Sequence, residues 1–312
     1  MSTAYLLVAH GSTDPRHRKS LMRLAQTVRQ QLADPAWVGR QGQPMRPEHP
    51  EGMLSRWPRA SPGGGPRRFP LPPESELLVS EDDGRQHPMP LVGTATLETA
   101  AVPLAEQIAI FGHRAAALGV RQLVVVPLFL LRGVHVVEDV PSELAQAQIH
   151  LPADMQVHMT DHLGGYQGLQ AFLASRLART TVETRLLVAH GSRRPGSNRL
   201  LERTAAKLGA AIAFWAVAPG LEEQVIHLIQ AGHQRIAIAP YFLFAGGITD
   251  SITQQTEALA ERFPRVRFRL LPPLGSSADL ARVVSDVALT APPPLEQGNN
   301  ISPVLLGNGI TA

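Results

Sequence analysis

The chain has 312 residues, an apolar fraction of 44%, a formal charge of +3 and no cysteine. This length gives room for two domains with a sizeable core in each. The lack of cysteine excludes disulfides, thiolate zinc sites and iron–sulfur ligation, and the mild charge does not favour a nucleic-acid partner. The first apolar run, Tyr5–Ala9, is too short for a signal peptide or a membrane span, so we expect a cytoplasmic protein with no membrane partner.

The first apolar run belongs to a motif that occurs twice. LLVAHGS stands at Leu6–Ser12 and again, with all seven residues identical, at Leu186–Ser192. Such a repeat indicates a duplicated domain. Behind each copy, apolar residues recur at helical spacing, and the first of these helices is predicted to begin after Pro15 with Ser12 or Asp14 as its cap.

Two stretches do not follow the repeat. Residues 34–89 interrupt the first copy and are rich in proline, glycine and arginine, as in SPGGGPRRFPLPP. The last stretch, residues 291–312, has a similar character. Such compositions bury too little apolar surface to offset the entropy of ordering, so we interpret both as disordered, one as an insertion and the other as a tail.

The rest of the chain alternates strand-like runs with helical patterns. GVRQLVVVPLFLLRG at Gly119–Gly133 matches GHQRIAIAPYFLFAG at Gly232–Gly246, and both are apolar on consecutive positions, as strands buried on two faces should be. Further helices and strands are predicted at Pro103–Leu118, Pro141–Ile149, Met155–Thr160, Leu221–Ala231 and Val266–Leu271. The pattern predicts an α/β fold of two similar lobes, residues 1–180 and 181–290, each a small parallel sheet flanked by helices.

Ionisable residues follow three predicted strands in the first half. His10 ends the first motif, Glu98 follows the short run in VGTATLETA, and His135 follows the long apolar strand. Because the carboxyl ends of parallel strands meet at one edge of a sheet, these groups should converge. Two imidazoles and a carboxylate suit an exchangeable divalent ion, and they can also accept protons. The second half keeps His190 but has Ala216 in place of Glu98 and Ile248 in place of His135.

These motifs resemble a known family. LLVAHGS, LVGTATLE and the PLFLxxGxH pattern at Pro127–His135, followed by EDVP, resemble the sirohydrochlorin chelatases, the class II chelatases of siroheme and cobalamin synthesis. The resemblance covers nearly the whole chain outside the insertion and the tail. It matches a long, two-lobed form in which one half carries the active site and the other copy is degenerate.

The resemblance implies ATP-independent insertion of a divalent metal ion into sirohydrochlorin, a polycarboxylate tetrapyrrole. Fe²⁺ is favoured as the ion and Co²⁺ comes next, with no organic cofactor and a monomeric protein. His10 and His135 would bind the ion, and Glu98 would assist catalysis. Cations near the motifs could bind the substrate carboxylates; the candidates are Arg16, Arg132 and Arg193.

Two other functions compete with this interpretation. Histidine phosphatases begin with a similar motif, LVRHGE, but the arginine that clamps the phosphate is replaced here by Ala9 and, in the second copy, by Ala189. A non-catalytic carrier of metal or tetrapyrrole could use the same residues as a chelatase. Only a measurement of turnover would distinguish such a carrier from a chelatase. Of the remaining histidines, His17 could touch the substrate and His162 could reach the same edge of the sheet.

Overall fold

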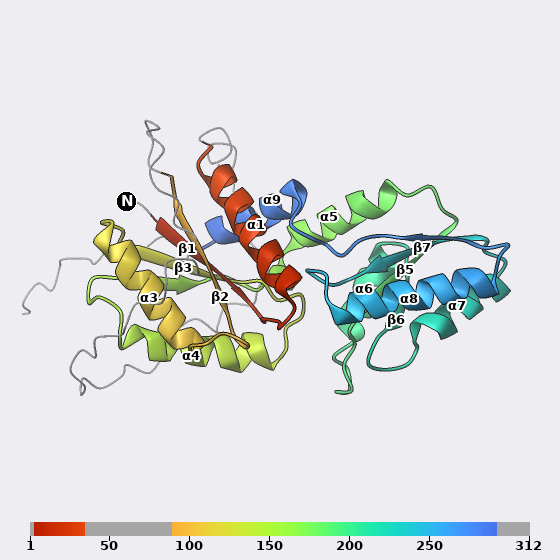
Figure 1. Cartoon of the computed structure of the whole chain (residues 1–312), viewed down its shortest axis with the longest axis horizontal. Helices are drawn as coiled ribbons and strands as arrows, with labels where there is room; N and C mark the ends of the chain where they lie inside the picture. The colour runs from red at the N-terminus through yellow and green to blue at the C-terminus, as the bar shows by residue number, and fades with distance from the viewer. Residues whose placement is uncertain (1–2, 35–88, 292–312) are drawn as a thin grey trace, which may run out of the picture.

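The chain folds into two lobes that lie side by side (Figure 1). The computed structural model describes residues 3–34 and 89–291, so the predicted insertion and tail lie, apart from their end residues, outside it. Each lobe contains a four-stranded parallel sheet, as the sequence predicts, and the two sheets have the equivalent orders β2-β1-β3-β4 and β6-β5-β7-β8. Within the described ranges no helix is long and apolar enough to cross a membrane.

The first lobe has two layers of helices around its sheet. Its elements are β1 (Thr3–Ala9), α1 (Pro15–Leu32), β2 (Leu91–Thr96), α3 (Leu104–Ala117), β3 (Gln122–Pro127), η3 (His135–Asp139), α4 (Val140–Gln148), β4 (Gln156–Met159) and η4 (Leu163–Gly165). Alternate residues of β1 enter different cores, so Leu6 packs with α3 and α4 while Leu7 packs with α1. A strand buried on both faces is therefore apolar at consecutive positions.

The second lobe repeats this arrangement. After α5 (Gln167–Ala178), the last helix of the first half of the sequence, the second half contains β5 (Thr184–Ala189), α6 (Arg199–Lys207), β6 (Ala211–Phe214), α7 (Leu221–Gln230), β7 (Arg235–Pro240), α8 (Gly247–Arg262), β8 (Arg267–Leu270) and α9 (Ala278–Leu289). The outer face of its sheet packs against α7 and α8. The inner faces of both sheets contribute to one continuous apolar core, which joins the lobes.

The last helix of each half lies on the other lobe. Helix α5 follows β4 of the first sheet, yet its Arg176 donates a hydrogen bond to the Pro273 carbonyl oxygen at 3.0 Å, and Arg185 donates to its Leu177 carbonyl oxygen at 3.2 Å. Helix α9 follows β8 of the second sheet but packs on α1 and β3 (Figure 1). A boundary near residue 180 therefore divides the strands between the two lobes, but α5 and α9 each pack on the lobe across that boundary.

This exchange predicts that α9 stabilises the lobe to which it does not belong in sequence. Leu280 is fully buried in the shared core. We expect Leu280→Ala to lower the free energy of unfolding by about 2–5 kcal/mol, because the lost methyl groups leave a cavity between the lobes. Urea denaturation measures this change. The control is Leu118→Ala at the end of α3, where the side chain is 60% exposed; equal effects of the two substitutions would contradict the prediction.

Candidate metal centre

Three potential metal ligands meet at the carboxyl edge of the first sheet. His10 directly follows β1, Glu98 comes two residues after β2, and His135 begins η3, beyond the end of β3. Each offers one ligand atom, and these atoms all lie within 4.8 Å of one another. Three positions that are far apart in the sequence thus converge because their strands are parallel neighbours.

The backbone fixes how His10 and Glu98 face each other. The parallel register of β1 and β2 continues beyond the strands: the amide of Leu97 donates to the Ala9 carbonyl oxygen at 2.9 Å, and the amide of Glu98 donates to the His10 carbonyl oxygen at 2.8 Å. The two side chains start from this paired backbone, and His10 Nδ1 lies 3.8 Å from Glu98 Oε2.

Gly11 allows this close approach of the two chains. Its φ of +100° is a left-handed conformation that favours glycine, and a Cβ at this position would lie 2.1 Å from the Glu98 carbonyl oxygen. A side chain here would push the Glu98 segment away from β1. The glycine after the histidine in the motif therefore has a structural role at the metal centre.

His135 is oriented by a carboxyl group that the sequence analysis did not single out. It lies in a π-helical turn, in which the Val140 amide donates to the His135 carbonyl oxygen, and its Nδ1 donates to Asp139 Oδ2 at 2.7 Å. This bond places the proton of a neutral ring on Nδ1 and leaves Nε2 free to bind a metal. The four-residue spacing of His135 and Asp139 on one helical turn is the sequence signal that could have identified the pair.

The centre is open to solvent. The side chains of His10 and Glu98 are 48% and 53% exposed, and that of His135 is 36% exposed. The imidazole rings of His10 and His135 stand edge to face with centroids 4.7 Å apart. The centroid of the Phe129 ring lies 6.5 Å from that of His10 and 6.0 Å from that of His135. The ligands therefore form one side of a coordination sphere and leave the other side accessible.

The second lobe has the same backbone frame but keeps only one of the three residues, His190. The amide of Trp215 donates to the Ala189 carbonyl oxygen at 2.9 Å and that of Ala216 to the His190 carbonyl oxygen at 2.8 Å. Ala216 therefore occupies the backbone position of Glu98, as the sequence repeat predicts. Across the part of the chain that the structure describes, the triad of the first lobe is the one group with metal-binding spacing.

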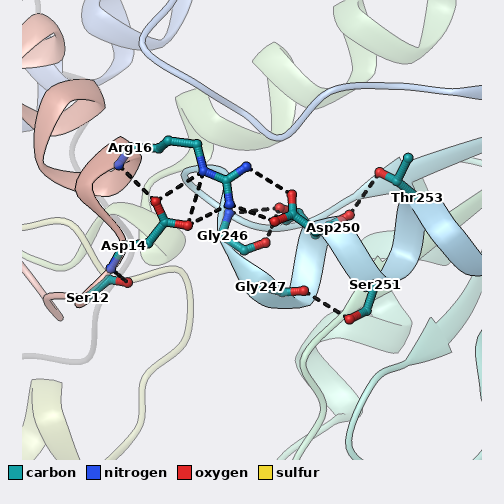
Figure 2. Close-up of polar contacts among 9 residues, drawn as sticks. Ser12, Asp14, Arg16, Gly246, Gly247, Asp250, Ser251 and Thr253 are labelled. Carbon is teal, nitrogen blue, oxygen red and sulfur yellow. Dashed lines mark hydrogen bonds and ion pairs between the residues drawn. The ribbon is translucent and has the colours of Figure 1, made fainter.

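The three predicted arginines lie in loops or first turns near the carboxyl edges of the two sheets, but in different surroundings. Arg132 is exposed and close to His162, whose pKa is lowered by burial and further by the charge of Arg132. Arg193 is exposed in the loop between β5 and α6. Arg16 instead pairs with Asp250 of the second lobe (Figure 2). A role of any of them toward substrate carboxylates stays a prediction.

Two other histidines lie outside the triad. His162 is buried, with only 6% of its surface exposed, so it offers little surface to a ligand at the open edge of the sheet. His17 is half-buried with its ring edge to face against Phe244 of the second lobe, 5.0 Å between centroids. Burial lowers the pKa of His17, and the neighbouring His10 lowers it further. His17 therefore lies between the metal centre and the second lobe.

Hollows in the surface do not by themselves locate the centre. A pocket of about 180 Å³ lies beside it, between α1 and the segment after β2, and includes His17 and Thr99 in its lining. A larger hollow of about 850 Å³ lies between α5 and α9, and none of the three ligand residues lines it. The convergence of ligand atoms is the more specific signal.

Comparisons with known proteins match both halves of the chain. The model of the CbiX family matches residues 78–180 and again residues 184–291. The sirohydrochlorin ferrochelatase of Priestia megaterium is 27% identical over 180 residues. This match covers 54% of the chain and 66% of that relative, which is just under two thirds of its length.

Solved structures share the two-lobed fold. SirB from Bacillus subtilis with Fe³⁺ aligns with a TM-score of 0.61 at 16% identity, covering 92% of this chain and 94% of that one. The sirohydrochlorin chelatase SirB from Bacillus subtilis subspecies spizizenii, in complex with cobalt, aligns with a TM-score of 0.58 at 16% identity, covering 93% and 94%. At these identities the likeness is one of fold.

The Asp139 bond predicts an effect on metal affinity. Asp139→Ala should weaken Co²⁺ binding about 10- to 100-fold, because the His135 ring loses the group that sets its tautomer and orientation. Asp139→Asn keeps an acceptor for Nδ1–H and should retain most of the affinity. Titration of each variant with Co²⁺, followed by the absorption of the bound ion, measures its affinity. Glu138→Ala removes the adjacent exposed carboxyl group as a control; an equal loss there would contradict the orienting role.

Proposed function

The chain belongs to the CbiX family, and from this premise we propose that it inserts a divalent metal ion into sirohydrochlorin without ATP. The observation that carries the proposal is the triad of His10, Glu98 and His135, whose ligand atoms lie within 4.8 Å at an exposed edge. The name of the Priestia megaterium relative supports the same reaction class.

The open geometry suits delivery of a metal ion better than its storage. A closed cage of four protein ligands is typical of structural metal sites, which hold their ion in place. Here two imidazoles and one carboxyl group, each at least one-third exposed, leave positions for the pyrrole nitrogens of a macrocycle. The ion can therefore exchange protein ligands for macrocycle nitrogens one at a time.

The same residues can handle the protons that metal insertion releases. The macrocycle loses two pyrrole N–H protons as the ion enters, so charge balances with no change in oxidation state. We propose that His10 and His135 hold the ion while the carboxylate of Glu98, beside them, accepts the protons and passes them to solvent. Its exposed position, 53% for the side chain, allows that second transfer.

We propose Fe²⁺ as the ion and Co²⁺ as the next best, which places the reaction in siroheme or cobalamin synthesis. Imidazole and carboxylate ligands suit both ions and do not choose between them. The ferrochelatase name of the curated relative favours iron. We further propose that Arg132 and Arg193, both exposed, bind carboxylates of the substrate.

The decisive experiment mixes purified protein with metal-free sirohydrochlorin and Fe²⁺ or Co²⁺ under anaerobic conditions and follows the absorbance change. We expect catalysed insertion that His135→Ala abolishes, since this change removes an ion ligand. His190→Ala is the matched control in the degenerate lobe and should retain most of the activity. Equal loss in the two variants would contradict a single metal centre.

Turnover also separates a chelatase from a carrier of metal or tetrapyrrole that uses the same residues. A carrier binds its ligand in stoichiometric amounts, whereas a chelatase forms many product molecules per chain. Product that stops at one equivalent would contradict the proposed catalysis.

A further inference from the structure

The guanidinium group of Arg16 lies between two carboxylates, one from each lobe (Figure 2). Asp14, from the same lobe, accepts from Arg16 Nε at 3.1 Å and from Nη2 at 2.6 Å. Asp250, in the first turn of α8 in the second lobe, accepts from Nη1 at 3.1 Å and from Nη2 at 2.6 Å. The guanidinium fork has two edges that can each bind a carboxylate with two bonds, and both are occupied.

This ion pair lies at the boundary between the lobes and close to the metal centre. Arg16 precedes His17, whose ring rests against Phe244 of the second lobe. Burial lowers the pKa of His17, and the nearby imidazole of His10 adds to that effect. Arg16 is thus a cation in the first turn of α1, which directly follows the loop that begins at His10.

The two carboxylates differ in how firmly they are held. Asp14 is the N-cap of α1, and its Oδ1 also accepts the Arg16 backbone amide at 2.8 Å, so its release would uncap the helix. Among the described residues, the Asp250 carboxylate is hydrogen-bonded to Arg16 alone. Both members of the inter-lobe pair are about half exposed, and water screens such a contact.

The charges of the cluster oppose an anionic ligand while Asp250 stays in place. Arg16 lowers the pKa of Asp14 to about 2 and also lowers that of Asp250, so both carboxylates are ionised near neutral pH. One guanidinium between two carboxylates has a net charge of −1. A carboxylate of a polyanionic substrate therefore cannot use Arg16 unless one of these groups leaves.

Resting on the proposed function, we propose that Asp250 is an internal competitor for the Arg16 subsite and that a carboxylate of the incoming tetrapyrrole replaces it. The incoming group would take the Nη1–Nη2 edge of the fork and find the same two donors. Arg16 then holds either the second lobe, through Asp250, or the substrate. Substrate binding and release of this inter-lobe contact become one event.

The test measures the dissociation constant of metal-free sirohydrochlorin by fluorescence quenching. Asp250→Asn removes the competing charge and should tighten binding about threefold to tenfold, whereas Arg16→Ala should weaken it to a similar extent. In the Arg16→Ala background, Asp250→Asn should have no further effect, because the subsite for which Asp250 competes is gone.

The matched control is Glu222→Gln, which removes one carboxylate from another exposed ion pair of the second lobe, with Arg262 at 2.6 Å. Arg262 ends α8, twelve residues and about 18 Å along the helix from Asp250. Glu222→Gln should leave the dissociation constant unchanged. If it tightens binding as much as Asp250→Asn, the effect is one of net charge and the inference is wrong.

The outcomes separate this inference from the proposed function. Normal turnover with no effect of Asp250→Asn, or an effect that persists without Arg16, would overturn the competitor role and leave the chelatase proposal intact. Tighter binding by Asp250→Asn in a protein that binds sirohydrochlorin but never turns over would support the competitor role and contradict the catalysis. Wild-type protein that does not bind sirohydrochlorin would overturn both.

Discussion

The parallel pairing of β1 with β2 and β3 is the constraint on which the candidate metal centre depends. Hydrogen bonds in the two ladders fix the register, and the last of them joins the Glu98 amide to the His10 carbonyl oxygen. The ligands therefore start from backbone positions that are set before any metal is present. Gly11, with its positive φ, permits the close approach of the His10 and Glu98 segments. The bond from His135 to Asp139 orients the third residue of the triad, which lies beyond the end of β3.

The second lobe shows that this frame does not require the chemistry. The amide of Ala216 pairs with the His190 carbonyl oxygen as Glu98 pairs with His10, although alanine offers no ligand. Backbone hydrogen bonds depend little on the side chain, so the duplicated fold could keep its register while its ligands changed. His190 thus lies at the edge of a sheet whose sequence repeat has Ala216 and Ile248 in place of Glu98 and His135.

Because α5 and α9 each pack on the lobe that belongs to the other half of the sequence, we expect the two lobes to fold together. The apolar residues of these helices join the inner faces of both sheets in a continuous core, so neither half of the sequence covers its own sheet completely. The lobes also meet through polar and aromatic contacts, the Arg16–Asp250 pair and the His17–Phe244 contact. The apolar core holds the lobes together independently of the exposed Arg16–Asp250 pair, as the proposed replacement of Asp250 by a substrate carboxylate requires.

The sequence by itself determined the duplication, most of the strands and several of the helices, because local periodicity shows which face of a strand or helix is buried. It also placed His10, Glu98 and His135 after strands that end at one edge of the first sheet. It also identified Ala216 as the counterpart of Glu98 through the repeat. Only the tertiary structure decided which lobe α5 and α9 cover, that Asp139 orients His135, and that Arg16 meets Asp250. These depend on contacts between distant segments, and an amphipathic pattern shows that a face is covered without showing what covers it.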